Sequence, residues 1–329
     1  MTDFAFFYIA FMGKPLWMWF VFAAVVAALL IFDLGIMHRK EHEIGTKESL
    51  FFSAFYIGIG LLFGVWVWRE MGTGKAFEYF TGFIVEKTLS IDNVFVIAML
   101  FSFFRVPRIY QHRVLFWGIL GAVVLRGIMI GLGAALVSEF EWILYVFAVF
   151  LIYTGIKLLF TGEKPADLEH NRLFLFMNRH FRVTREFHGH DFFVRQPSQK
   201  HGCKVIWITP LFLCLVMIEA ADVLFAVDSV PAIFVITTDP FIVYTSNIFA
   251  ILGLRALYFV LSSIVKRFKY LPYALSLVLV FIGSKTFIAH FAGWEKFPTG
   301  LSLGITSVIL GSGIGFSVWK TRKQARKRA

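Results

Sequence analysis

The chain has 329 residues, of which 58% are hydrophobic and only 16% are charged. Soluble domains average about 45–50% apolar and about 25% charged residues, so this composition excludes an ordinary soluble fold and indicates a polytopic membrane protein. The net charge of +11 does not indicate nucleic-acid binding, because the basic residues lie in loops beside long apolar runs, as the positive-inside rule describes.

Nine stretches are apolar and long enough to cross a bilayer, which takes about 20 helical residues. They lie near residues 17–37, 50–68, 76–104, 114–137, 142–160, 205–236, 241–263, 271–290 and 299–319. The sequence therefore predicts an all-α membrane protein with about nine transmembrane helices. We interpret the first stretch as a retained helix, because its apolar run is long for a signal peptide and no basic segment or clear cleavage site accompanies it.

The distribution of lysine and arginine predicts the orientation. The loops after the first, third, fifth and seventh spans, together with the C-terminal tail, carry 23 of these residues, whereas the N-terminus and the remaining loops carry 4. We therefore expect the N-terminus outside and the C-terminus in the cytoplasm, an alternation that requires an odd number of spans.

Two parts of the chain resemble each other in a common register, found by aligning LSIDNVFVIAM with FAVDSVPAIFV. The register pairs Glu86 with Asp222, Asp92 with Asp228, Arg126 with Arg255, Gly155 with Gly283, and Lys157 with Lys285. Each repeat contains three spans, so the second repeat enters the membrane from the opposite side. Such inverted repeats are typical of transporters, whose substrate site lies at the repeat interface near the midplane.

The repeats divide the chain into five parts. These are two N-terminal transmembrane helices in 1–75, the first repeat in 76–160, a basic cytoplasmic loop in 161–204, the second repeat in 205–290, and the last helix with a basic tail in 291–329. Residues 171–182 of the loop can form an amphipathic helix, which we expect on the anionic inner leaflet rather than in a separate domain.

Five carboxylates lie inside the third and sixth spans, where each unpaired charge costs about 2.5–3.5 kcal/mol. They are Glu86, Asp92, Glu219, Asp222 and Asp228. A cation is the partner that such a cluster favours, and oxygen ligands suit Mn²⁺, Ca²⁺ or Mg²⁺ better than Cu(I) or Zn²⁺. Asn93 and Ser229, which follow the paired aspartates, are candidate neutral ligands, and Asn247 is a weaker candidate.

These acids can share one site only if the backbone of the third and sixth spans departs from a straight helix. Residues six apart in a straight helix lie about 120° apart around its axis, so neither Glu86 and Asp92 nor Asp222 and Asp228 would share a face. We therefore expect the third and sixth spans to bend or unwind between their paired acids. Pro231 supplies a cause in the sixth span, because proline removes a backbone donor.

Internal salt bridging is the alternative explanation for the buried acids. The available cations are Lys87, Arg126, Lys157, Arg255 and Lys285. Lys157 and Lys285, which the repeat places in equivalent positions, lie near span ends, where lysine can extend to the interface. We expect the two mid-span arginines to pair with acids, either holding them in place or replacing the transported cation in its absence. Asp33 is expected to be interfacial.

Several other classes of function lack their sequence signals. The chain has no Walker A motif, which disfavours ATP-driven pumping, and no nucleophile–base–acid constellation, so we do not expect an enzyme. Its two cysteines, Cys203 and Cys214, do not form a CxxC pattern, which disfavours a dithiol redox site.

Four segments carry a resemblance to a known family: EKTLSIDNVFV, IEAADVLFAVDSVPAIF, TTDPFIVYTSNIFAILGLRALYF and FIGSKTFI. In these motifs, and over nearly its whole length, the chain resembles the TerC family and within it the Alx-type inner-membrane proteins. The resemblance implies metal-ion homeostasis, with Mn²⁺ export as the leading activity, beside older labels of tellurium resistance and redox modulation. It carries the family's acidic positions over to the five acids named above.

Together, these observations predict a bacterial inner-membrane transporter that exports Mn²⁺ through a carboxylate site between the repeats. Mn²⁺ is the transported substrate, with Ca²⁺ or Mg²⁺ as alternatives, and no organic cofactor is expected. The expected partners are the ion and the lipid bilayer, without nucleic acid, and the oligomeric state is left open. Two alternatives remain: a non-transporting membrane protein that delivers metal, and a membrane redox modulator.

Overall fold

The structure is a computed structural model that describes residues 9–37, 46–140, 142–161, 172–184, 186–197, 204–264, 271–294 and 297–326. Its helices are α1 (Leu16–Met37), α2 (Thr46–Phe103), α3 (Arg108–Glu139), α4 (Ile143–Thr161), α5 (Arg172–His180), α6 (Pro210–Ile236), α7 (Pro240–Leu252), α8 (Leu254–Ile264), α9 (Leu271–Phe291) and α10 (Thr299–Arg326). Two antiparallel hairpins pair β1 (Ala10–Phe11) with β2 (Lys14–Pro15), and β3 (Phe193–Pro197) with β4 (Lys204–Ile208). The predicted all-α polytopic fold is confirmed.

Eight helices of the described chain are long and apolar enough to cross a membrane. One of them, α2, contains both of the spans predicted at 50–68 and 76–104, because the chain reverses at Gly72, whose φ of 83° glycine adopts readily. The two arms pack antiparallel: the Tyr79 hydroxyl donates to the Gly60 carbonyl at 2.8 Å, and Gly64 lies against Phe80. The count of nine crossings and their orientation stay predictions.

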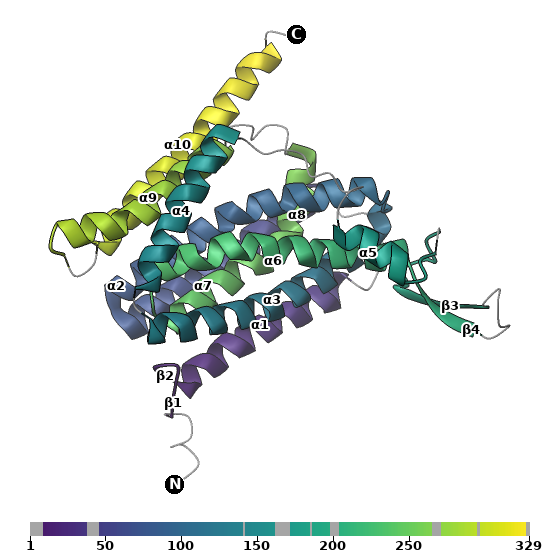
Figure 1. The fold of residues 1–329 in the computed structure, drawn as a ribbon, viewed down its shortest axis with the longest axis horizontal. Helices are drawn as coiled ribbons and strands as arrows, with labels where there is room; N and C mark the ends of the chain where they lie inside the picture. The colour runs from purple at the N-terminus through teal and green to yellow at the C-terminus, as the bar shows by residue number, and fades with distance from the viewer. Residues whose placement is uncertain are drawn as a thin grey trace.

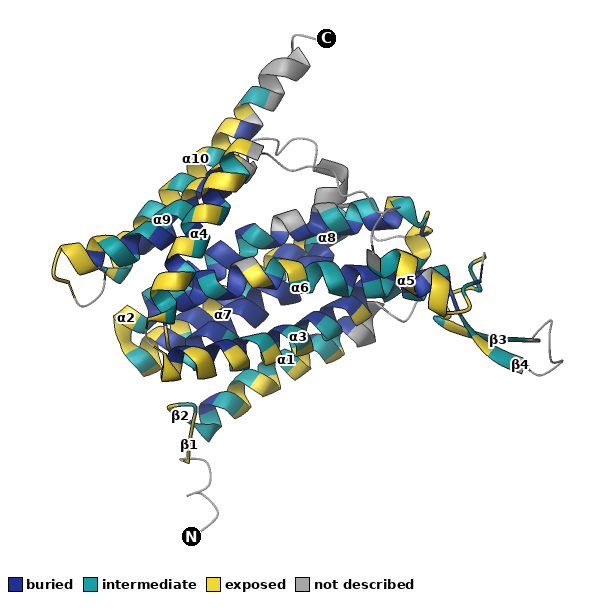
Figure 2. Ribbon diagram, viewed as in Figure 1, coloured by how far each residue is buried: buried dark blue, intermediate teal, exposed yellow. Residues whose placement is uncertain are grey.

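The helices form two groups (Figure 1). Helices α1, α2, α3, α6 and α7 run side by side as one bundle, α8 packs against α2, and α4, α9 and α10 form a second group inclined to the bundle. Burial is greatest in α7 and on the inner faces of its neighbours, whereas α1, α4 and α10 expose apolar side chains such as Phe160 and Val308 (Figure 2). An exposed apolar surface of this kind suits contact with lipid.

Two sequence-predicted spans have different limits in the structure. The sixth helix begins at Pro210 rather than at 205, because residues 204–208 form β4 and Thr209 caps the helix by accepting from the Phe212 amide. The seventh span is divided at Gly253 into α7 and α8. The Lys87 ammonium stabilises that break, since it donates to the Ala250 carbonyl at 2.9 Å near the end of α7.

The expected unwinding between paired acids is wrong. The backbone of α2 stays helical from residue 86 to 92, and that of α6 from 222 to 228. Pro231 lies close to the end of α6, where its missing N–H removes one helical hydrogen bond, and the helix continues to Ile236. Neither helix therefore offers unwound carbonyl groups between these positions.

Helices α4 and α9 cross at two glycines that the sequence repeat pairs. A Cβ at Gly155 would lie 2.8 Å from the Ser276 carbonyl, and one at Gly283 would lie 2.5 Å from the Ala148 carbonyl. Ser276 lies seven residues before Gly283, and Ala148 lies seven residues before Gly155. The two contacts are therefore reciprocal, and the helices run antiparallel. A pair of inverted repeats predicts this geometry, and the repeat as a whole stays a prediction.

Candidate functional site: a buried arginine between two acids

The centre of the bundle contains one guanidinium between two acids. Arg126 lies on α3 and is 1% exposed, and its Nη1 pairs with Glu86 of α2, which is fully buried. Its Nη2 and Nε donate to the two carboxylate oxygens of Asp222 on α6 at 2.9 and 3.1 Å. This is the two-point geometry that suits a planar guanidinium and a carboxylate. One side chain thereby joins three helices.

Three neutral side chains complete the network. Arg126 Nη1 also donates to Ser229 Oγ at 3.3 Å and to Asn247 Oδ1 at 3.1 Å. The amide of Asn247 reaches Glu86 Oε2 at 3.5 Å, and that of Asn93 reaches Asp222 Oδ1 at 3.4 Å. Both predicted neutral candidates therefore contact the network, as does the weaker candidate Asn247.

Helical spacing explains why these residues meet. Glu86 and Asn93 are seven residues apart on α2, and Asp222 and Ser229 are seven apart on α6, so each pair shares a helix face. The sequence register pairs Glu86 with Asp222, and the structure joins these two positions through Arg126. Acids from the two predicted repeats thus meet each other.

Glu219 lies one turn before Asp222 on α6 and has a different environment. Its carboxylate packs against Gly121 of α3, where a Cβ would collide with it. Its Oε2 is buried without a hydrogen-bond partner in the described chain, and so is Oδ1 of Asn93. Buried polar atoms usually have partners, so these two oxygen atoms are available to bind a ligand.

A small cavity of about 20 Å³ adjoins Asn93 and Asp222, and its other lining residues, among them Ile218 and Ala122, are apolar or glycine. Asp222 keeps 13% of its side chain exposed, whereas Glu86 keeps none, so Asp222 is the member of the pair that faces open space. The volume suffices for one water-sized particle. The arrangement offers a small, largely apolar space with one amide and one carboxylate in its wall.

The remaining predicted ligands, Asp92 and Asp228, have side chains outside the described residues, so their place in the site stays a prediction. Among the side chains that are described, no group of three or more His, Cys, Asp or Glu residues is placed to hold a metal ion. The reason is visible in the geometry, since the guanidinium of Arg126 occupies the space between Glu86 and Asp222.

The other candidate cations form no salt bridge with these acids in the described structure. Lys87 binds a backbone carbonyl, Lys157 is exposed, and Lys285 is buried with Ser302 as its hydrogen-bond partner. The expectation that Lys285 extends to the interface is therefore wrong. In the described part of the site, Glu86 and Asp222 share one guanidinium, and Glu219 lies one turn from Asp222 without an ion-pair partner, so carboxyl groups outnumber the guanidinium.

The second mid-span arginine lies in another network. Arg255 on α8 pairs with Asp33 of α1, whose carboxylate also accepts from the Tyr56 hydroxyl at 2.9 Å, and Arg255 lies 3.0 Å from the His112 ring. Asp33 is 8% exposed and therefore buried in this network, and its depth in the membrane stays a prediction. The sequence could not show this pairing, because Asp33 and Arg255 are 222 residues apart.

Apolar helices surrounding a buried ionic network define an integral multi-pass membrane protein. Residues 71–325 match the family described as "Integral membrane protein TerC family", and the chain belongs to that family. The predicted resemblance is confirmed.

Relatives extend over almost the entire chain. An uncharacterized membrane protein of Rickettsia bellii is 46% identical over 300 residues, covering 91% of this chain and 96% of the relative. An uncharacterized membrane protein of Myxococcus xanthus is 46% identical over 310 residues, covering 94% of each chain. A protein of Salmonella typhi named "Putative membrane-bound redox modulator Alx" is 43% identical over 324 residues, covering 96% of this chain and 98% of the relative. No solved structure matches.

Replacing the guanidinium tests its structural role. Arg126→Gln leaves Glu86 and Asp222 buried without their cation, and breaking a buried ion pair in this way costs about 3–5 kcal/mol. We expect a clearly lower melting temperature for the purified variant, measured by thermal unfolding in detergent. Lys157→Gln, which removes an exposed cation, is the control. Equal melting temperatures for the two variants would contradict the role assigned to Arg126.

Proposed function

We propose that this protein transports divalent metal ions across the bacterial inner membrane and that Mn²⁺, exported from the cytoplasm, is the favoured substrate. The observation that carries the proposal is the meeting of Glu86 and Asp222 on one guanidinium in the centre of the bundle. A substrate site at the interface of two inverted repeats is the arrangement that secondary transporters use.

The charge of the site supports a divalent substrate. Three carboxyl groups lie around one described guanidinium, and buried charges without partners are costly in an apolar protein. The oxygen atoms available are carboxylate, amide and hydroxyl oxygens, which suit hard cations such as Mn²⁺, Mg²⁺ and Ca²⁺. The preference for Mn²⁺ among these rests on the family resemblance.

The ion and the arginine would compete for the same acids. We propose that Arg126 holds Glu86 and Asp222 together when no ion is bound and that the arriving ion displaces the guanidinium. Asp222, which lines the small cavity, would meet the ion first, and the unpaired oxygen of Glu219 would be a further ligand. Asp92 and Asp228, with Asn93 and Ser229, would complete the ligand set. Exchange of a proton on one of the acids would supply the coupling.

Flux measurements test this proposal. Glu86→Gln and Asp222→Asn keep side-chain size but each remove one ligand charge, so we expect the Mn²⁺ flux into or out of proteoliposomes to fall by more than about tenfold. Asp92→Asn and Asp228→Asn should have the same effect. Glu70→Gln, at an exposed acid, is the matched control and should keep wild-type flux. Wild-type flux in the Glu86 and Asp222 variants, with normal insertion, would refute the proposal.

Competition between ion and arginine gives an independent test. In Arg126→Gln the ion no longer displaces a guanidinium, so Mn²⁺ should raise the melting temperature of this variant by more than it raises that of the wild type. Parallel titrations with Mg²⁺ and Ca²⁺ rank the substrates. Equal shifts in both proteins would show that the ion binds away from Arg126.

The names of relatives suggest a second candidate, redox modulation. Cys214 is fully buried in the described structure, and Cys203 lies outside the described residues. If the transport proposal holds, replacing both cysteines by serine leaves Mn²⁺ flux unchanged, whereas loss of flux would favour a thiol-dependent activity. The third candidate, metal delivery without transport, predicts Mn²⁺ binding to the purified protein with no flux in proteoliposomes.

A further inference from the structure

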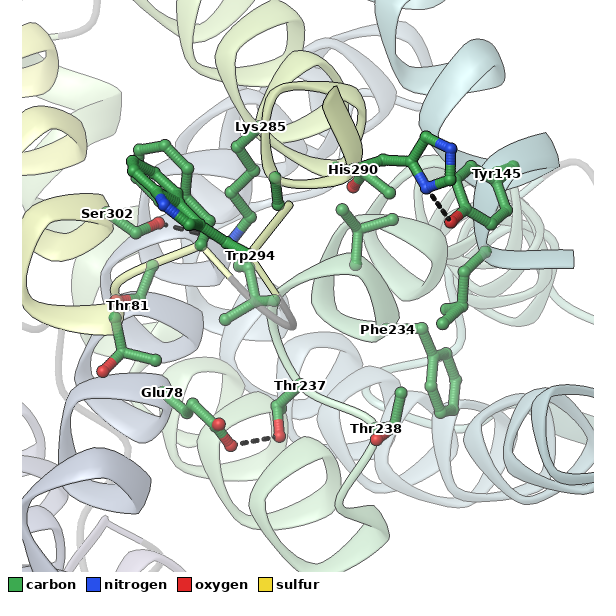
Figure 3. Close-up of a pocket in the computed structure, with 17 residues that line it drawn as sticks. Glu78, Thr81, Tyr145, Phe234, Thr237, Thr238, Lys285, His290, Trp294 and Ser302 are labelled. Atoms are coloured by element: carbon green, nitrogen blue, oxygen red, sulfur yellow. Dashed lines mark hydrogen bonds between the residues drawn. The ribbon is translucent and has the colours of Figure 1, made fainter. Parts of the chain in front are cut away.

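A second, larger cavity lies away from the acidic network, at the end of the bundle opposite the hairpin of β3 and β4. It has a volume of about 290 Å³ and is enclosed by α4, α9 and α10, the C-terminal end of α6 and the start of the second arm of α2. Figure 3 shows Lys285 of α9 and Ser302 of α10 on one side of the cavity, with Glu78 and Thr237 on the other. By the predicted orientation, this is the outer side of the membrane.

Lys285 is the unusual residue of this cavity. It is 6% exposed, and its ammonium group donates to Ser302 Oγ at 3.2 Å. An ammonium has three hydrogens to donate, and in the described chain no carboxylate lies within salt-bridge distance of this one. A buried charge with a single neutral partner is costly. An anion in the cavity would accept from the remaining hydrogens of this ammonium and stabilise its charge.

The acid in the same cavity is already neutralised. Glu78 accepts from Lys75 at 2.7 Å and from the Thr237 hydroxyl at 2.5 Å. Asp239 pairs with Lys14 at 3.0 Å and with Lys75 at 3.5 Å. These two acids pair with the two lysines, so among the described residues Glu78 attracts the Lys285 ammonium across the cavity but forms no salt bridge with it.

The rest of the lining also suits an anion. Thr286, Thr299 and Ser302 bring hydroxyl groups to the cavity, and Trp294 lies at its edge. Helix α10 begins at Thr299, so the positive end of its dipole lies at the cavity. A metal ion is disfavoured here, because the ammonium would repel it.

Comparison within the chain shows that the burial of Lys285 is particular to this cavity. The sequence register pairs it with Lys157 on α4, and Lys157 is exposed. The two lysines follow equivalent glycines at the reciprocal crossing of α4 and α9. Their helices are therefore comparable, while only Lys285 faces an enclosed polar space.

We propose that this cavity binds a phosphate-type oxyanion, with the Lys285 ammonium as its counter-charge and the neighbouring hydroxyls as further donors. The oxyanion can come from free phosphate or from the headgroup of a lipid, because exposed aromatic residues such as Phe291 and Trp294 flank the site at the predicted membrane surface. Both sources offer the same oxygen atoms to the ammonium. The site is independent of the acidic network and of its substrate.

The binding experiment uses the full-length protein, purified in a detergent without phosphate groups. One arm titrates inorganic phosphate and measures binding by equilibrium dialysis, and the other adds phosphatidylglycerol and counts retained lipid by native mass spectrometry. Lys285→Met should weaken binding about tenfold or more, since it removes a charge-assisted contact. Lys285→Arg should restore binding, and Lys157→Met, the matched control, should bind like the wild type.

The phosphate titration and the lipid-retention experiment distinguish free phosphate from a lipid headgroup, and together they test the proposal. Binding of phosphate supports a free anion, and retention of phosphatidylglycerol alone supports a lipid headgroup. The proposal is overturned if neither probe binds the wild type, or if Lys285→Met binds as well as Lys157→Met. Should Lys285→Met fail to fold, Ser302→Ala must weaken binding severalfold in its place. Glu86→Gln should keep full anion binding, so failure of the metal proposal would not affect this result.

Discussion

The contact between Arg126 and the two acids Glu86 and Asp222 is the interaction on which the rest of the structure depends. It joins α2, α3 and α6 at the centre of an apolar body, where an unpartnered charge would be costly. The packing around it permits this contact. Gly121 lets the Glu219 carboxylate lie against α3, and Gly133 leaves room for the Phe234 ring. Small residues allow the close helix approach that a membrane protein needs.

The two repeat-related arginines show how a symmetric sequence becomes an asymmetric site. Arg126 binds acids that come from both predicted repeats, whereas Arg255 binds Asp33 of α1, a helix that lies outside them. The additional helix thus supplies a partner for one arginine and leaves the other to the central acids. A single guanidinium at the centre, in place of two, is the reason that the acids there outnumber the cations.

The sequence could predict the membrane class, the positions of most helices and the pairing of Glu86 with Asp222, because these follow from composition, spacing and register. It could not predict the partners of Asp33 or the burial of Lys285, since both depend on helices brought together over long sequence distances. The expected unwinding failed for a related reason. It assumed that the paired acids of one helix must converge, whereas the structure joins acids from different helices through Arg126.

Buried cations of this chain are satisfied in different ways, and the exception among them is informative. Arg126 has two carboxylates, Arg255 has Asp33, and Lys87 has the Ala250 carbonyl at the end of a helix. Lys285 has one hydroxyl. The central acids show the opposite imbalance, because Glu219 keeps an oxygen without a partner in the described chain. Asp222 lines the smaller cavity and Lys285 the larger one, so the same physical rule, that buried charge requires a partner, directs a cation to the first cavity and an anion to the second.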